Sequence, residues 1–203
     1  MTALAPSAPR LVLADRVFPR HLVVDITLVV LGAAFVGGLA QLYVPLWPVP
    51  VTGQTLGVLL VGATLGAVRG ALSLAVYALL GIVGVPWFSE ASSGFGVIAG
   101  PTGGYIIGFI ASAALVGWLS QREWDRKIFK ALATFLGGSL IVFAFGLPWL
   151  AFSLGIGVEL TLEYGLYPFI LGGIIKAAIA ALLLPAAWWA ANKLEKRDEP
   201  SKS

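Results

Sequence analysis

The stretch ITLVVLGAAFVGGLAQLYVPLWPVPVTGQTLGVLLVGATLGAV, residues 26–68, holds 43 residues without a charged side chain. A helix crosses a bilayer with about 20 apolar residues, so this run is too long for one span and fits two. Three prolines within residues 45–50 interrupt it, and proline removes a backbone donor and fixes φ, so no helix continues through them. The stretch therefore predicts two spans, near Ile26–Tyr43 and Thr52–Val68, joined by a rigid connection.

The composition of the whole chain agrees with a membrane protein. Of its 203 residues 59% are hydrophobic and 11% charged, whereas soluble domains carry about 45–50% and about 25%. An ordinary soluble enzyme, a disordered chain and a nucleic-acid-binding module are therefore excluded. The chain has one histidine, no cysteine and no phosphate-binding G-x-x-x-x-G-K-[ST] motif, so we expect no metal site, no cofactor and no enzymatic activity.

Four further apolar runs predict four more spans. Arg69 and Gly70 are expected to separate the second span from the third, and Pro148 to bend or break the fifth. The predicted fold class is all-α: one integral membrane domain over residues 1–203, a six-helix bundle with its core at about 26–191, capping loops on the outer face, and tails at 1–22 and 192–203. The additional spans are Ala71–Val85, Gly103–Ser120, Ala131–Ser153 and Pro168–Ala191.

The basic residues predict the orientation. Twelve of the 13 fall before the first span, in the second and fourth connections, or in the C-terminal tail, which six spans place on one side. By the positive-inside rule both termini are cytoplasmic. A nucleic-acid role for the basic tail is disfavoured, because anionic lipid headgroups explain it. The twelve residues are Arg10, Arg16, Arg20, Arg69, Arg122, Arg126, Lys127, Lys130, Lys193, Lys196, Arg197 and Lys202.

The thirteenth basic residue, Lys176, lies eight residues inside the sixth span. At 1.5 Å per residue this is about 12 Å from the outer end, and an intramembrane ammonium costs about 2.5–3.5 kcal/mol on insertion scales. One interpretation is that its side chain extends outward to Glu159 or Glu163. The interpretation we favour is that Lys176 lines a cavity open to the outside and meets an anionic or strongly polar ligand.

Two outer connections carry aromatic residues suited to covering such a cavity. Leu46–Gln54 contains Trp47, and Pro86–Gly100 contains Trp87 and Phe88 beside several glycines and serines. Aromatic side chains on a hinged loop suit a lid over a partly apolar ligand. The alternative is an aromatic belt at the membrane interface, which needs no ligand.

Four sequence blocks carry a family resemblance. PVPVTGQT at 48–55 resembles the P-V-P-x-T-x-Q-T signature of BioY, the biotin-specific S components of energy-coupling factor (ECF) transporters. The blocks GAVRGA at 66–71, YALLGIVGVP at 77–86 and GPTGGYIIGF at 100–109 follow in the family's order. The likeness runs from about Leu31 to Lys176.

This resemblance implies a function and a set of partners. The chain would bind biotin with high affinity near the outer surface of the cytoplasmic membrane and support its uptake as the substrate-specific subunit. A T component and two ATPases would drive transport, although some members of the family work without them. An S component for another vitamin or a biotin-related compound, a membrane-embedded enzyme and a purely structural subunit are the alternatives.

The sixth span departs from the family pattern. Members typically carry P-G-D-x-x-K there, and this chain reads LGGIIK at 171–176, so Lys176 is retained while Gly173 stands where the acid is expected. Loss of a charge-assisted hydrogen bond removes about 1.5–3 kcal/mol. Thr52, Gln54, a loop serine or water then replaces the carboxylate, or biotin binds more weakly, or the ligand is a relative of biotin.

The candidate residues form two sets. Pairs of small residues in the first span resemble the A-x-x-x-A motif with which S components meet the T component, although they also suit packing within the bundle. These partner-binding candidates are Ala33 with Gly37 and Ala34 with Gly38. The substrate-binding candidates are Trp47, Thr52, Gln54, Trp87, Phe88, Gly104, Tyr105, Gly173 and Lys176.

Overall fold

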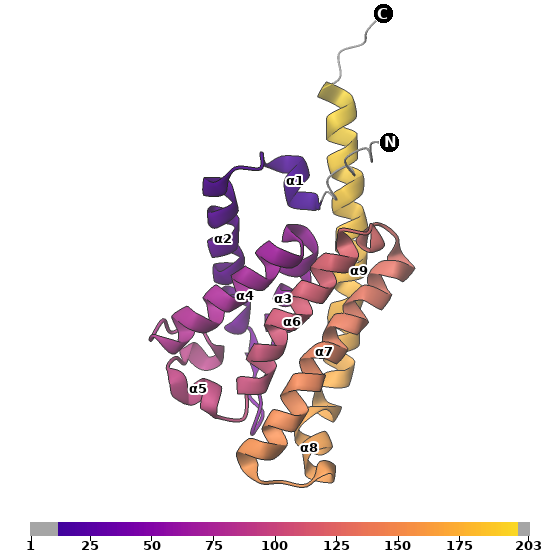
Figure 1. The fold of residues 1–203 in the computed structure, drawn as a ribbon. Helices are drawn as coiled ribbons and strands as arrows, with labels where there is room; N and C mark the ends of the chain where they lie inside the picture. The colour runs from indigo at the N-terminus through magenta and orange to yellow at the C-terminus, as the bar shows by residue number, and fades with distance from the viewer. Residues whose placement is uncertain (1–11, 199–203) are drawn as a thin grey trace, which may run out of the picture.

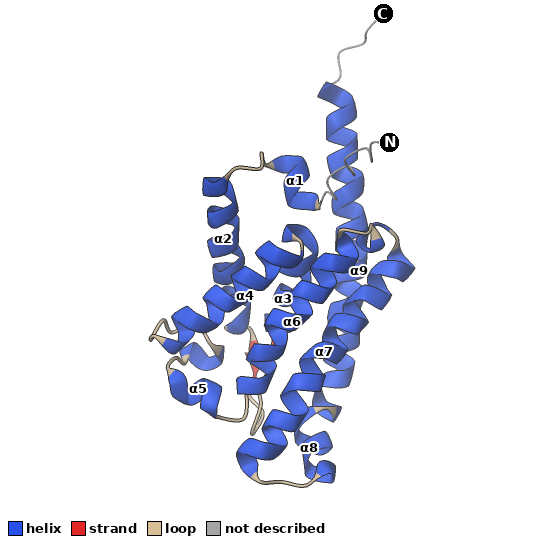
Figure 2. Cartoon of the chain, in the orientation of Figure 1, coloured by secondary structure: helices blue, strands red, loops and turns tan. Residues whose placement is uncertain are grey.

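The computed structural model describes residues 12–198, with side chains up to residue 193, and is built almost wholly of helices (Figures 1 and 2). Arg10, Lys202 and the outermost parts of the two predicted tails lie outside the described residues. A short helix α1 (Leu13–Val17) precedes the main helices, and the connections between them contain two short helices and two 3-10 turns: η1 (Ser89–Ala91), α5 (Phe95–Ala99), η2 (Trp124–Arg126) and α8 (Val158–Gly165). The main helices are α2 (Leu22–Ala40), α3 (Gln54–Leu65), α4 (Ala67–Ile82), α6 (Gly103–Ser120), α7 (Ile128–Leu154) and α9 (Tyr167–Asp198).

A helix lies in each of the six ranges predicted as spans, but the helices differ in length. By length and composition, α2, α6, α7 and α9 are long and apolar enough to cross a membrane. With 12 and 16 residues, α3 and α4 are shorter. A 12-residue helix rises about 18 Å, less than the hydrocarbon thickness of about 30 Å. Four candidate spans are thus observed, and the count of six stays a prediction.

The boundary between α3 and α4 differs from the predicted one. The chain breaks at Gly66, whose φ of +86° suits glycine, whereas Arg69 and Gly70 lie inside the first turn of α4. The predicted boundary was wrong because a charged residue can lie within a helix when its side chain pairs with groups of opposite charge. Arg69 donates to Asp25 Oδ1 at 3.0 Å and Asp15 Oδ1 at 2.5 Å, so it ties α4 to α2 and α1.

Other helix boundaries also differ from those of the predicted spans. The helix of the first predicted span, α2, ends at Ala40. After it, Tyr43–Val44 pairs antiparallel with Val51–Thr52 as a small hairpin, β1 and β2 (Figure 2). Pro148, predicted to bend or break the fifth span, does not break it, since α7 is one helix from Ile128 to Leu154. At the C-terminus, α9 continues through part of the predicted tail to Asp198.

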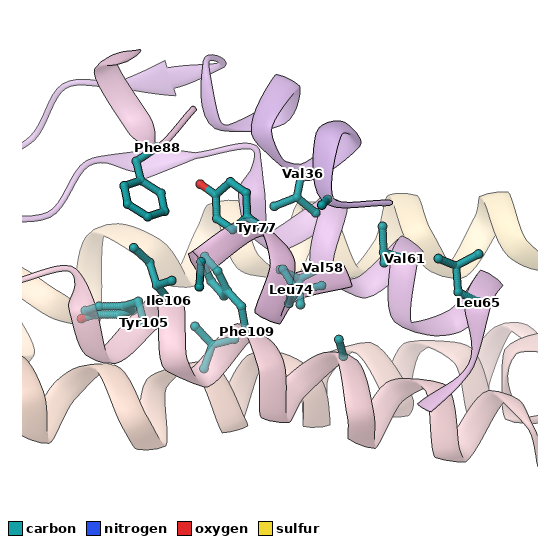
Figure 3. Close-up of a cluster of buried hydrophobic side chains, with 14 of the residues drawn as sticks. Val36, Val58, Val61, Leu65, Leu74, Tyr77, Phe88, Tyr105, Ile106 and Phe109 are labelled. Carbon is teal, nitrogen blue, oxygen red and sulfur yellow. The ribbon is translucent and has the colours of Figure 1, made fainter. Parts of the chain in front are cut away.

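Helix α6 is central to the packing, with α3 and α4 on one side and α7 on the other (Figure 1). Figure 3 shows the buried side chains between these helices, among them Val58, Leu74, Tyr77 and Phe109. Gly104 brings α6 against α7, because a β-carbon there would lie 2.2 Å from Trp149 Cβ and 2.6 Å from the Phe145 carbonyl oxygen. This glycine, predicted as a ligand contact, is a packing residue.

Near the turn η2 a carboxylate is buried. Asp125 has no exposed surface, and one of its oxygens accepts a 2.7 Å hydrogen bond from Trp188 Nε1 of α9. Its other oxygen, Oδ1, has no hydrogen-bond partner among the described residues. Burial raises the pKa of Asp125 to about 6, although the Trp188 bond and the charge of Arg126 favour the ionised form. Asp125 therefore destabilises the fold when it is charged.

We predict that Gly104→Ala lowers the melting temperature by several degrees. Overpacking of this kind costs about 1–3 kcal/mol because the two helices must separate. Gly137→Ala in α7 is the matched control, since a β-carbon there meets nothing within 4 Å and alanine favours a helix. Thermal unfolding of both variants in detergent checks this, and equal melting temperatures would show that α6 and α7 do not need the close approach.

We predict that Asp125→Asn stabilises the protein at neutral pH. The folded pKa of about 6 lies above the unfolded value of about 3.9, so wild-type stability falls as pH rises between them. Asparagine still accepts from Trp188 and does not ionise. The difference in melting temperature between variant and wild type should be small at pH 4 and grow to several degrees by pH 7. A difference independent of pH would contradict this account.

Candidate functional site

A cavity lies between the β1–β2 hairpin, the connection from α4 to α6, the starts of α3, α6 and α9, and the middle of α7. The empty space within it and at its mouth, open solvent included, amounts to about 670 Å³. The lining residues are Val49, Pro50, Thr52, Gln54, Thr55, Phe88, Ser89, Val97, Thr102, Tyr105, Ile106, Phe109, Ser139, Val142, Phe143, Phe169, Gly173 and Lys176.

Lys176 is the cationic group of this cavity. Its Nζ donates a 2.5 Å hydrogen bond to the backbone oxygen of Thr52, which ties α9 to the hairpin. The alternative contact with Glu159 or Glu163 is not observed, and both glutamates are exposed on α8. An ammonium has three N–H donors, so two remain for a ligand. Among the described residues, no carboxylate lies within ion-pair distance of Nζ.

Thr52 and Gln54 form a buried polar wall beside Lys176. The Thr52 hydroxyl donates to Gln54 Oε1 at 2.7 Å and accepts from the Gln54 backbone N–H at 3.2 Å. Gln54 Nε2 then donates to the Tyr77 hydroxyl at 2.6 Å. Both side chains are over 90% buried, and these bonds fix their rotamers. The polar wall is therefore rigid before any ligand arrives.

Much of the remaining lining is aromatic. Tyr105 stacks on Phe169 with ring centroids 6.2 Å apart and meets Phe143 edge-on, while its hydroxyl donates to the Gly165 carbonyl at 2.9 Å. Phe88 is 1% exposed and meets Tyr77 edge-on at 5.4 Å. These rings offer flat apolar surface to a ring-shaped ligand, while the tyrosine hydroxyl is already used.

Gly173 leaves open volume next to Lys176. It lies three residues before the lysine, so both share one face of α9. A β-carbon at Gly173 would meet nothing within 4 Å. The residue thus lines the cavity without filling it, and a larger side chain there would point into free space.

Three predicted site residues do not line the cavity. Trp47 is 76% exposed and packs on Tyr164, and it lines a second, adjoining pocket of about 670 Å³, open solvent included. Trp87 turns away, because its Nε1 donates to the Tyr77 carbonyl at 2.9 Å. Gly104 faces α7. Of the predicted lid aromatics, only Phe88 reaches the cavity.

The structure also adds residues that the sequence reasoning did not select. The added polar groups are hydroxyls from four segments. Ser139 could have been found as a hydroxyl on an otherwise apolar helix, and Phe169 by its helical spacing from Gly173 and Lys176. Thr55 and Thr102 lie within two of the sequence blocks that carry the family resemblance, so those blocks could have pointed to them, whereas Ser89 is one of several serines in its loop. The added hydroxyl residues are Thr55, Ser89, Thr102 and Ser139.

The two small-residue pairs of α2 face different ways. Ala33 and Gly37 are buried, and a β-carbon on Gly37 would lie 3.1 Å from Trp87, so this pair packs within the bundle instead of facing a partner. Ala34 and Gly38 are exposed, and nothing lies within 4 Å of a β-carbon on Gly38. Adjacent helix positions differ by about 100°, which explains the division. Only Ala34 and Gly38 remain candidates for a docking face.

Comparisons with known proteins agree on one family. The model of the BioY family matches residues 11–193. "Biotin transporter BioY2" of Lactococcus lactis subsp. cremoris is 37% identical over 158 residues, which cover 78% of this chain and 86% of that protein. "Biotin transporter BioY" of Rhizobium etli is 36% identical, covering 78% of this chain and 90% of the relative.

A solved structure shows the same fold. The S-component for biotin from an ECF-type ABC transporter superposes with a TM-score of 0.73 at 27% identity, over 81% of this chain and 90% of that one. The family match extends over both the helices and the cavity described above. The chain therefore belongs to the BioY family.

Proposed function

We propose that this chain binds biotin in the cavity at Lys176 and is the substrate-specific subunit of an ECF-type biotin uptake system. One observation carries the proposal: a lysine with two uncommitted N–H donors lies in a cavity with an aromatic wall. Biotin combines a carboxylate, a ureido group and a compact fused ring. The relatives with this fold are named as biotin transporters or a biotin S-component, which supports the same ligand.

The cavity matches the parts of biotin by chemistry. The fused ring suits the surface between Phe88 and Tyr105, and the Lys176 ammonium suits the valerate carboxylate or the ureido oxygen. The ureido N–H groups require acceptors. With glycine at position 173, the acceptors available are hydroxyls such as those of Ser89 and Thr102.

The placement of charge supports the proposed orientation. The cavity lies near the start of α6, whereas Arg122, Arg126, Lys127 and Lys130 follow its end, at the other side of the bundle (Figure 1). Basic residues favour the cytoplasmic side. We therefore place both termini in the cytoplasm, the cavity toward the outside of the cytoplasmic membrane, and six helices within the bilayer.

The proposed system includes a T component and two ATPases. The exposed pair Ala34 and Gly38 gives α2 a smooth face against which another membrane helix can pack closely. Gly173 favours a second candidate, an S component for another vitamin or a biotin-related compound. A melting-shift panel of vitamins on the purified chain separates the two candidates.

We predict that Lys176→Met weakens biotin binding at least 10-fold without unfolding the protein. The substitution removes the charge-assisted hydrogen bonds, which are worth about 1.5–3 kcal/mol, and it leaves an unbranched side chain one atom shorter. Titration calorimetry in detergent measures the affinity. Lys193→Met, a lysine near the Trp189 ring, is the control and should bind as wild type. An unchanged affinity in Lys176→Met would remove this lysine from the site.

We predict that Gly173→Asp folds normally and binds biotin about 10-fold more tightly. The new side chain enters free space one turn from Lys176 and offers a carboxylate acceptor to the ureido N–H groups. Gly173→Ala is the control, because it adds the β-carbon without the acceptor. Affinity of Gly173→Asp at or below that of Gly173→Ala would show that biotin's N–H groups do not face position 173.

A further inference from the structure

The connection between α4 and α5, residues 83–94, closes one side of the cavity with Phe88 and Ser89. The side chain of Gln41, the residue that follows α2, holds it. Gln41 Nε2 donates to the carbonyl oxygens of Phe88 at 3.0 Å and Trp87 at 3.3 Å, and the Ala91 N–H donates to Gln41 Oε1 at 3.1 Å. Both ends of this amide are thus engaged with residues 87–91.

The held segment contains strained backbone. Glu90 and Ala91 have φ of +62° and +51°, a left-handed conformation that is unfavourable for residues other than glycine. Such a conformation persists only where neighbouring groups fix it. The bond from the Ala91 N–H to Gln41 fixes one of the two strained residues directly.

The same amide continues a hydrogen-bonded chain from the ligand cavity. Lys176 bonds to Thr52, Thr52 to Gln54, and Gln54 to the Tyr77 hydroxyl. Tyr77 in turn donates to the Trp87 carbonyl at 3.3 Å, the oxygen that Gln41 also contacts. The cavity wall and the loop are therefore joined through fixed polar contacts.

Outside the loop lies a second pocket that shares four lining residues with the cavity. Ser89 is one of them, so displacement of residues 87–91 would merge the two spaces and open a route to the ligand site. The same Gln41 Nε2 also lies 3.1 Å from the Gly37 carbonyl oxygen, so its two hydrogens are shared among three carbonyls. The amide thus connects the loop to α2, the helix that carries the exposed Ala34 and Gly38. The shared residues are Pro50, Ser89, Val97 and Thr102.

We infer that Gln41 is a positioning residue that latches residues 87–91 over the cavity, and that breaking its hydrogen bonds opens the site. The ligand's identity rests on the proposed function, but opening can be measured without a ligand. When the latch is lost, the loop should open more often and bound biotin should leave faster.

The chain has no cysteine, so an introduced one reports opening. Ser139→Cys changes one atom at a cavity-lining position that is 7% exposed. We expect Gln41→Met in this background to speed modification by a charged methanethiosulfonate about 10-fold, without ligand, and to speed biotin dissociation by a similar factor. Gln121→Met, the same change at the far end of α6, should leave both rates unchanged.

A second reporter separates a latch from general stability. Ser120 is fully buried at the end of α6 away from the cavity, so Ser120→Cys provides this reporter. If Gln41→Met speeds labelling at both reporters equally, or at neither, the inference is wrong. Should Gln41→Met fail to fold, Tyr77→Phe removes one loop hydrogen bond while keeping the ring. It should speed labelling at Ser139→Cys by a smaller factor, and wild-type labelling would overturn the latch.

The outcomes also distinguish the two proposals. Faster labelling in Gln41→Met, together with no biotin binding by wild type, would leave the latch standing and remove the proposed function. If the wild type binds biotin and Gln41→Met changes neither labelling nor dissociation, the proposed function stands and the latch is wrong.

Discussion

The structure depends on one constraint: an ammonium among apolar helices must have polar partners. Lys176 meets it by donating to the Thr52 carbonyl, and this single bond joins α9 to the hairpin at the mouth of the bundle. Because a backbone carbonyl satisfies only one of its three N–H groups, the lysine keeps binding capacity in an otherwise apolar setting. The rest of the site combines a fixed wall of amide and hydroxyl groups, at Thr52 and Gln54, with the aromatic rings of Phe88, Tyr105, Phe143 and Phe169.

Helix α6 packs closely against its neighbouring helices and also lines the cavity. Close approach at Gly104 locks α6 to α7, and the break at Gly66 lets α3 and α4 fold back against α6. The cavity lies where the hairpin and the connection from α4 to α6, instead of further helices, cover the bundle. Those loops are held by side chains, notably Gln41, and side-chain hydrogen bonds are cheaper to break than helix packing. This difference gives a rigid scaffold with one side that can open.

Much of the fold could be predicted from the sequence because length and hydrophobicity decide where helices form. The range Gly103–Ser120 was predicted to the residue, and Lys176 was predicted to line a cavity, where it lies. The Gly66 break was missed because Arg69 looked like a boundary until its partners Asp15 and Asp25 were known. Trp47 and Trp87 were wrongly predicted to line the cavity, because the sequence of a loop does not tell which way its aromatic side chains point. Side-chain orientation, including the split between Ala33 with Gly37 and Ala34 with Gly38, depends on tertiary contacts that one sequence does not display.

The central claim is that Lys176 turns its spare donors to biotin within the cavity. A structure of the chain with biotin bound tests it most directly. The account predicts ligand density between Phe88 and Tyr105, with a carboxylate or ureido oxygen about 2.7–3.0 Å from Lys176 Nζ. Biotin at another position, with Lys176 bonded to Thr52 alone, would contradict it.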